Sequence, residues 1–444
     1  MAILLGSSRR RAMVTLFVGV ALVNTAIGGA NAASTLVGAR VVGLGWSGLP
    51  NALAVLGTAA GTFGLSRLMA RRGRRTGLLF GYAVAVVGAL AAFVALTTGK
   101  LLVLFLGMAL VGVGNGAAQL SRYAAADLYP TPRRGWALSS IVWAGTVGGV
   151  VGPNLLSPAS TIARTVELPP LAGAFLIGAV VLAAAVVAAT ILPRRSPPRR
   201  VESAPDRGEA APLLRRTALL VAIVAMVTAQ FDMSAVMTMT PLAMSMNGQG
   251  LGLIGGVLSI HIVGMFALSP LSGELADRWG GATVVAAGAA LLTAATITAA
   301  LSPVVGLPLL VPGLFLLGYG WNLCFVGAST LLSRHVADAG QTRVQGSVDT
   351  VMWIASAFAS MASGGLLAIA GYTGLVVAAG AVTVVPLTVM LGIWRRAAVG
   401  SAQVEAMLAD GQLATGGNGS ARLRGPRPEP VRGGDEQDDR DAAS

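Results

Sequence analysis

The chain has few charged residues for its length and only one cysteine. Asp, Glu, Lys and Arg make up 11% of its 444 residues, hydrophobic residues make up 55%, and the mean hydropathy is +0.75. Soluble domains carry about 25% charged residues, so the composition excludes a soluble protein and indicates one that crosses a membrane several times. The single cysteine, Cys324, excludes an intramolecular disulfide and a C-x-x-C site.

Twelve apolar stretches of about 20 residues follow one another, and a helix needs this length to cross a hydrocarbon core of about 30 Å. Strands that span a membrane are shorter and alternate in polarity, so we predict an all-α membrane protein with twelve transmembrane helices. The first stretch follows Arg9–Arg11 and resembles a signal peptide, but its length favours an uncleaved helix. The stretches lie near residues 12–34, 44–66, 76–98, 101–122, 136–157, 169–192, 217–240, 250–273, 281–301, 306–332, 345–369 and 373–394.

Arginine is concentrated in alternate connections between these stretches. Connections rich in arginine face the cytoplasm by the positive-inside rule, which places both termini there and explains the net charge of +13. No basic patch is interleaved with aromatic residues, so nucleic-acid binding is not predicted. The arginine-rich segments are Arg9–Arg11, Arg67–Arg75, Arg122–Arg134, Arg194–Arg216, Arg278, Arg334–Arg343 and Arg395–Arg396.

Internal similarity divides the chain into two halves of six stretches each. The segment SRLMARRGRR (Ser66–Arg75) follows the second stretch, and GELADRWGG (Gly273–Gly281) follows the eighth. A segment rich in Pro and charge separates the halves, and the composition of the last segment is typical of disorder. We therefore predict an N-terminal half at 1–192, a cytoplasmic linker at 193–216, a C-terminal half at 217–396 and a disordered cytoplasmic tail at 397–444.

Parallel six-helix repeats with a long linker describe a known transporter plan in which the substrate path lies between the halves. In this plan and in its cytoplasmic motif, G-x-x-x-D-R-x-G-R-R, the chain resembles the major facilitator superfamily. The resemblance implies a gate in which the acid and the arginine hold helix ends together in the outward-facing state. The second copy of the motif keeps Gly273, Asp277, Arg278 and Gly280, and the first keeps Arg71, Gly73, Arg74 and Arg75. Because the first copy carries Ala70 at the acidic position and Ser66 at the first glycine, we expect its half of the gate to be weaker.

Seven of the fifteen methionines fall between Met226 and Met265. Met233 and Met237 form M-x-x-x-M, and His261 and Met265 form H-x-x-x-M. On a helix, this spacing puts both side chains on one face, about 6 Å apart along the axis. Three thioethers and one imidazole suit Cu(I) and do not suit Mg²⁺ or Ca²⁺. For one methionine pair alone, the filling of gaps in an apolar core is an equally good interpretation.

This succession of motifs is similar to that of the CcoA-type copper importers, a subgroup of the superfamily. The resemblance implies copper uptake across the bacterial inner (plasma) membrane for maturation of cbb3-type cytochrome oxidase. Copper would be the transported substrate, and the resemblance implies no permanently bound cofactor and no enzyme activity. The implied partners are the copper ion, membrane lipid and a cytoplasmic copper chaperone.

The predicted topology orders the four ligands by depth. Met237 lies nearest the outer face, Met233 and His261 meet near mid-membrane, and Met265 lies deepest. A soft ion would pass down this ladder, exchanging one ligand at a time, after entering from the outer methionines Met239, Met244 and Met246. Asp232 is a candidate for proton coupling or for neutralising a bound cation, whereas Asp349 is interpreted as a solvated residue at a helix start.

Two other interpretations stay open. A proton-coupled exporter of drugs or small organic metabolites would use buried acids such as Asp232. Against it, Leu110 stands where many antiporters carry a basic residue, and Gly148, Gly152 and Pro153 match only part of an antiporter motif. We interpret these glycines as sites of close helix packing. A membrane sensor without transport is the third interpretation, suggested only by the C-terminal tail.

Overall fold

The computed structural model describes residues 2–130, 133–192, 212–335 and 338–416, and every regular element in these ranges is a helix. The prediction of an all-α protein is therefore confirmed for the part of the chain that the structure describes. The elements are α1 (Ala2–Val41), η1 (Leu44–Trp46), α2 (Leu49–Arg72), α3 (Arg74–Thr98), α4 (Leu101–Ala126), α5 (Arg134–Asn154), α6 (Leu156–Thr165), α7 (Ala172–Thr190), α8 (Pro212–Met246), α9 (Leu251–Phe266), α10 (Ser269–Trp279), α11 (Gly281–Val305), α12 (Leu307–His335) and α13 (Asp338–Gly416).

Ten stretches of the described residues are long and apolar enough to cross a membrane. The last of them, Val348–Arg396, has 49 residues, about twice the length of one crossing. Gly371 breaks its helix with a φ of 66°, so α13 accounts for the two predicted crossings at 345–369 and 373–394. Helix α5, with 21 residues, covers the predicted crossing at 136–157 as far as Asn154. The arrangement is therefore consistent with twelve crossings.

The eighth crossing is divided into α9 and α10. Leu268 between them has φ and ψ of −93° and 6°, outside the helical region, and Pro270 lies in the first turn of α10. Proline has no N–H for the helix ladder and is tolerated in the first turn, where that donor is unused. The division therefore places the methionine and histidine pair on α9 and the cytoplasmic motif on α10.

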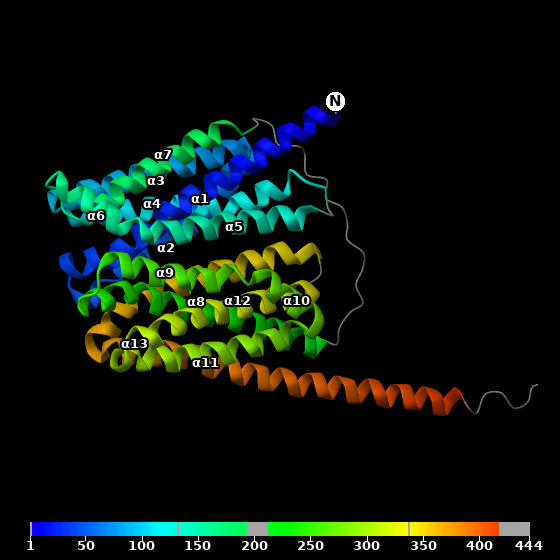
Figure 1. Ribbon diagram of the computed structural model, residues 1–444. Coiled ribbons are helices and arrows are strands. Elements are labelled where there is room, and N and C mark those ends of the chain that lie inside the picture. The colour runs from blue at the N-terminus through cyan, green and yellow to red at the C-terminus, as the bar shows by residue number, and fades with distance from the viewer. Residues whose placement is uncertain (1, 131–132, 193–211, 336–337, 417–444) are drawn as a thin grey trace, which may run out of the picture. The chain divides into compact units, whose positions relative to one another are not determined.

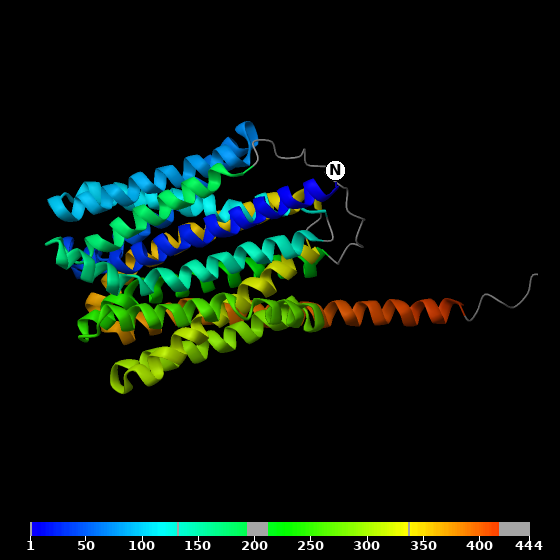
Figure 2. The same cartoon turned by 45° about the horizontal axis from the view of Figure 1, so that its top comes forward.

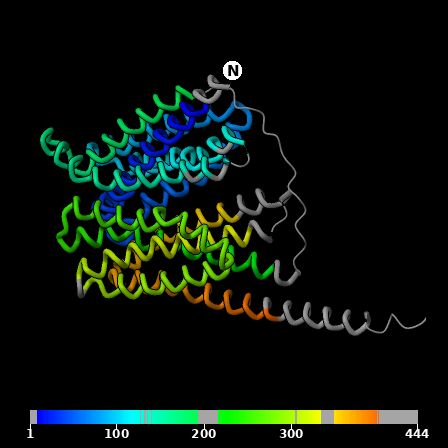
Figure 3. The backbone as a smooth tube through the Cα atoms, turned by 45° about the vertical axis from the view of Figure 1, so that its right-hand side comes forward, coloured from blue at the N-terminus to red at the C-terminus, as the bar shows by residue number. Residues whose placement is uncertain are grey.

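By its contacts, the chain forms two units, residues 1–397 and residues 398–444. Within the first unit, α1 to α7 make one half and α8 to α12, with α13 up to residue 397, make the other. Figure 1 shows the halves as two layers with α5 and α9 facing each other, and Figure 3 also separates the layers, whereas parts of the two halves overlap in the view of Figure 2. The end of this unit that carries Arg9–Arg11, Arg71–Arg75 and Arg278 is called the basic end below, and the end that carries η1 is called the distal end.

Helix α13 extends to Gly416, so residues 397–416 are helical where the sequence predicts disorder. Helix formers such as Ala, Glu, Met and Leu recur there, and no proline interrupts them. The predicted linker is also shorter in the structure, because α8 already begins at Pro212. Residues 193–211 and 417–444 lie outside the described residues.

The two copies of the cytoplasmic motif share one backbone conformation. Gly73 ends α2 with φ and ψ of 87° and 159°, and Gly280 ends α10 with 82° and 152°. Only glycine adopts this region readily, which explains the glycine in each copy. The equal geometry supports the internal repeat that the sequence indicates.

Glycines also let helices within a half approach closely. A Cβ atom on Gly148 would lie 2.0 Å from the carbonyl oxygen of Ala21, and one on Gly152 would lie 2.3 Å from that of Thr25. Helices α5 and α1 therefore meet backbone to backbone. Close packing is thus a sufficient reason for these two glycines, as the sequence analysis expected.

Candidate functional site

The structure places the two predicted ligand pairs on two helices of the C-terminal half. Met233 and Met237 lie one turn apart on α8 and are partly buried against the core. His261 and Met265 lie one turn apart on α9 and are 1% and 9% exposed. Helix α12 packs against both α8 and α9, which make little contact with each other. Each pair therefore shares a helix face, and α12 is the neighbour common to both pairs.

The imidazole of His261 is held by a backbone carbonyl. Its Nδ1 donates a hydrogen bond of 2.8 Å to the carbonyl oxygen of Leu314 in α12. Gly318 allows this approach, because a Cβ there would lie 2.4 Å from the His261 carbonyl oxygen and 3.2 Å from Nδ1. The other ring nitrogen, Nε2, is buried without a hydrogen-bond partner. With the proton on Nδ1, a neutral ring presents the Nε2 lone pair.

Metal-ligating histidines usually donate their second ring N–H to a carboxylate, a backbone carbonyl or water, which fixes the tautomer and the ring orientation. His261 has this arrangement. The backbone of Met265 is anchored in a similar way, because Asn322 of α12 donates a hydrogen bond of 2.7 Å to its carbonyl oxygen. Asn322 also donates to Ser269 at the start of α10. These contacts fix the inner part of α9 against α12.

Asp232 is buried at 1% exposure, and its Oδ2 has no hydrogen-bond partner. The Cys324 thiol and the Tyr372 hydroxyl lie within electrostatic reach of this carboxylate. A buried carboxyl group without a compensating partner is costly in an apolar interior. Asp232 is therefore the described acid best suited to take up a proton or to balance a cation within the C-terminal half.

A polar cluster that the sequence analysis did not single out joins α8, α12 and α13. The Trp321 indole donates a hydrogen bond of 2.9 Å to the Gln230 Oε1, and the Gln230 amide donates to Ser234 and Ser356. The Trp321 ring also stacks on Phe325 at 5.2 Å between centroids. The sequence did contain a signal for this cluster. Gln230 is a polar residue in an apolar stretch, three residues before Met233.

Hydrogen bonds between the halves gather at the distal end. Asn51 donates to the Thr238 hydroxyl at 3.0 Å and to the Ser360 hydroxyl at 3.1 Å. Ser47 donates to the sulfur of Met239, which is fully buried. A Cβ on Gly48 would lie 1.7 Å from the Ser360 carbonyl oxygen, and Figure 1 shows this end of α2 reaching towards the C-terminal half. At this distal seal Met239 and Met244 are buried, whereas Met246 is 61% exposed.

At the basic end, the residues of the cytoplasmic motif pair within their own halves. Arg74 forms an ion pair of 2.9 Å with Asp127, the residue that follows α4. Arg278 pairs with Glu274 one turn earlier, both side chains being more than half exposed. Asp277 is exposed, and no ion pair of its carboxylate occurs with any residue that the structure describes.

The interpretation of Asp349 as a solvated residue at a helix start is wrong. It lies 11 residues inside α13, because this helix begins at Asp338. Its side chain is only half-buried, and it interacts electrostatically with Arg122 of α4, a residue of the other half. The two side chains are not within ion-pair distance. They are therefore opposite charges that face each other between the halves at the basic end.

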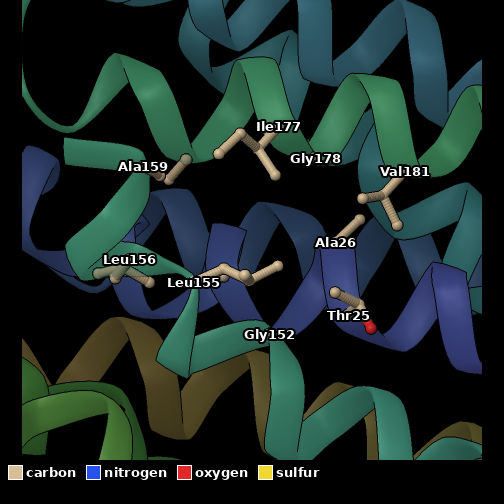
Figure 4. Close-up of a pocket in the computed structure, with 11 residues that line it drawn as sticks. Thr25, Ala26, Gly152, Leu155, Leu156, Ala159, Ile177, Gly178 and Val181 are labelled. Atoms are coloured by element: carbon tan, nitrogen blue, oxygen red, sulfur yellow. The ribbon is translucent and has the colours of Figure 1, made fainter. Parts of the chain in front are cut away.

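Two cavities lie in the N-terminal half, away from the methionine pairs. The smaller, between α1, α5, α6 and α7, holds about 10 Å³ and is lined by small and apolar side chains such as Thr25, Leu155 and Val181 (Figure 4). This volume is at the limit for one water molecule. The larger holds about 170 Å³ at the distal end between α1, α3 and α4.

The described chain has two halves of apolar helices, buried polar groups between these helices and a seal at one end. This arrangement is typical of a membrane transporter. Residues 16–360 and 222–425 match the Major Facilitator Superfamily. The chain therefore belongs to this superfamily and is a secondary transporter, not an enzyme.

Three known proteins show the range of the similarity. The uncharacterized MFS-type transporter YdeG of Bacillus subtilis (strain 168) is 32% identical, over 86% of this chain and 92% of its own length. The riboflavin transporter RfnT of Brucella anthropi is 29% identical, over 73% of this chain and 80% of its own length. The xylose transporter XylE from E. coli, in a partially occluded inward open conformation, shares the fold with a TM-score of 0.63 at 14% identity, over 86% of this chain and 97% of that one.

Proposed function

We propose that this transporter imports copper, as Cu(I), across the bacterial inner membrane with both termini in the cytoplasm. The observation that carries the proposal is His261, whose Nδ1 is held by the Leu314 carbonyl while its buried Nε2 has no partner. Met265 follows His261 by one turn of α9. An imidazole nitrogen and thioether sulfurs form a soft donor set, and such donors select Cu(I) over Mg²⁺ or Ca²⁺.

Met233, Met237 and Met265 are the proposed companions of His261. Met233 and Met237 lie on α8, which packs against α12 as α9 does. A rotation of either helix about α12 would change which thioethers face Nε2. The ion would then be passed between partial ligand sets, each weak enough to release it.

The remaining parts of the proposal concern charge and destination. Asp232, without a partner for its Oδ2, balances the cation or carries a coupling proton. Release at the basic end would deliver copper to a cytoplasmic chaperone and from there to cbb3-type cytochrome oxidase. No permanently bound cofactor takes part, because copper is the substrate.

The test is uptake of radioactive copper by cells that lack or contain the protein, under reducing conditions. His261→Leu should abolish protein-dependent uptake at unchanged membrane abundance. Met108→Leu is the matched control, because Met108 is fully buried in the N-terminal half and lies outside the proposed site. Uptake equal to wild type in the His261→Leu protein would refute the copper proposal.

A second candidate function is proton-coupled transport of drugs or small organic metabolites, including export. The observation that favours it is the Gln230, Ser356 and Trp321 cluster, which offers amide and hydroxyl groups beside an aromatic face. Such groups suit a planar organic solute, and one relative is named as a riboflavin transporter. Cells carrying Gln230→Ala separate the two candidates. Transport of organic solutes predicts altered riboflavin uptake or drug susceptibility with unchanged copper uptake in these cells.

A further inference from the structure

The larger cavity lies at the distal end of the N-terminal half. It holds about 170 Å³ and is formed by the end of α1, the turn between α3 and α4 and the residues before α7. Most of its lining is apolar, including Val37, Leu96, Leu104 and Leu171. A dry cavity of about 150 Å³ holds a benzene ring, so this one has room for a segment of an acyl chain.

Two cations stand at this apolar cavity. Arg40 and Lys100 belong to its lining, both are exposed, and Lys100 is the only lysine in the chain. Neither has an ion pair with any residue that the structure describes. Among the acids, Glu167 lies closest in sequence to a lining residue, two residues before Pro169. It is exposed, and within the described residues it forms no ion pair with Arg40 or Lys100.

The position of these cations is unusual for this topology. The positive-inside rule gathers basic residues at the basic end, and few are left at the distal end. Arg40 at the end of α1 and Lys100 in the turn between α3 and α4 run against this rule, and both line the same apolar cavity. An uncompensated pair of cations beside an apolar cavity at the membrane interface complements an anionic headgroup attached to an acyl chain.

We propose that this cavity is a binding site for an anionic phospholipid of the distal leaflet. Arg40 and Lys100 bind the phosphate, and the apolar wall between α1, α3 and α4 receives part of an acyl chain. The site lies within the N-terminal half and is separate from the proposed copper ligands. An experiment can therefore refute lipid binding at this cavity without refuting copper transport, and the reverse.

The single lysine provides a direct probe. Reductive methylation with ¹³C-formaldehyde labels Lys100 and the α-amine of the purified full-length chain, which give two resolvable NMR signals. The protein is placed in phosphatidylcholine nanodiscs with increasing phosphatidylglycerol. We expect the Lys100 signal to shift and saturate, while the α-amine signal follows only the bulk surface charge. Arg40→Gln should weaken the phosphatidylglycerol dependence about fivefold, the effect of one cation near a membrane surface.

Arg164→Gln is the matched control, because Arg164 is an exposed arginine of the same end that does not line the cavity. It should leave the titration unchanged. Ala95→Leu, which adds volume inside the cavity, should weaken lipid binding without changing charge. An equal shift with inorganic phosphate or with phosphatidylcholine alone would overturn the proposal, as would equal effects of Arg40→Gln and Arg164→Gln.

Discussion

Asn51 of α2 donates a hydrogen bond of 3.0 Å to the hydroxyl of Thr238 in α8, and this bond joins the two halves of the transporter at the distal end. The same amide donates to Ser360 of α13. One side chain thus links one helix of the N-terminal half to two helices of the other. The proposed import route must pass this point, so the seal has to open in the outward-facing state.

Removal of the Asn51 amide should therefore favour opening of the distal end. Each neutral hydrogen bond contributes about 1 kcal/mol net, so Asn51→Ala should raise the open population by roughly tenfold or more. The measurement is maleimide reactivity of Thr35→Cys, a buried position in the distal half of α1, in a Cys324→Ser background. Thr62→Ala is the control, because the Thr62 hydroxyl donates only within α2. Equal reactivity of the Asn51→Ala and Thr62→Ala proteins would contradict the role given to the seal.

The methionine ligands can be tested without a change of charge. Leucine is close to methionine in volume, so Met233→Leu or Met265→Leu should cost less than about 1.5 kcal/mol of stability. Copper uptake should be lost while the protein still folds and reaches the membrane. Uptake at the wild-type level by the Met233→Leu protein would remove that residue from the ligand set.

The second copy of the cytoplasmic motif predicts a separation of transport from binding. Asp277 is exposed, so Asp277→Asn should change stability by no more than about 0.5 kcal/mol. If Asp277 and Arg278 close the basic end in the outward-facing state, transport should fall while purified protein still binds copper. Equal loss of both activities would show that Asp277 acts on folding or on the metal site.

The ligand set predicts a shallow response to pH. Thioethers have no proton to lose, so among the four proposed ligands only His261 competes with protons for the metal. Copper binding should weaken modestly between pH 7 and about pH 6, where an unperturbed imidazole begins to protonate. Zinc prefers thiolate, imidazole and carboxylate ligands and should compete poorly. Loss of copper uptake at a tenfold excess of zinc would contradict a site of three sulfurs and one nitrogen.

The two motif copies have the same backbone turn, so replacing the glycine of either copy should lower stability by a similar amount. At Gly73 and Gly280, φ is 87° and 82°, and a side chain there costs about 1–3 kcal/mol. Gly73→Ala and Gly280→Ala should each lower the thermal midpoint in detergent. Gly64→Ala is the control, because a Cβ at Gly64 meets no atom within 4 Å and the residue lies inside α2. A lower midpoint for the control than for the two variants would contradict the backbone argument.

The crossings, and the placement of Met233 with Met237 and of His261 with Met265 on one helix each, were predictable from the sequence, because apolar length and i, i+4 spacing are local properties. The break of α13 at Gly371 falls between the predicted crossings at 345–369 and 373–394. The division at Leu268 was not predicted, because the sequence indicates one uninterrupted crossing at 250–273. The contact of His261 with Leu314 and that of Asn51 with Thr238 were not predictable. Each joins helices far apart in the sequence, and their rotation about their own axes is set by packing.

The helical segment 397–416 was mispredicted for a different reason. Its composition resembles that of the following Gly- and Pro-rich residues when the whole tail is averaged. Over its own length it contains mostly helix formers. A shorter window would have separated it from the remainder of the tail.

The distal seal consists of hydroxyl, amide, thioether and backbone groups, none of which carries a charge. At the opposite end, the halves set Arg122 against Asp349. Mobile ions weaken interactions between charges over a Debye length of about 8 Å at physiological ionic strength, and they act little on neutral contacts. In the proposed orientation the distal end faces the outside of the cell, so the salt content of the external medium can change with little effect on how readily the distal seal opens. The opposite charges of Arg122 and Asp349 make the opening of the basic end the step that responds to ionic strength.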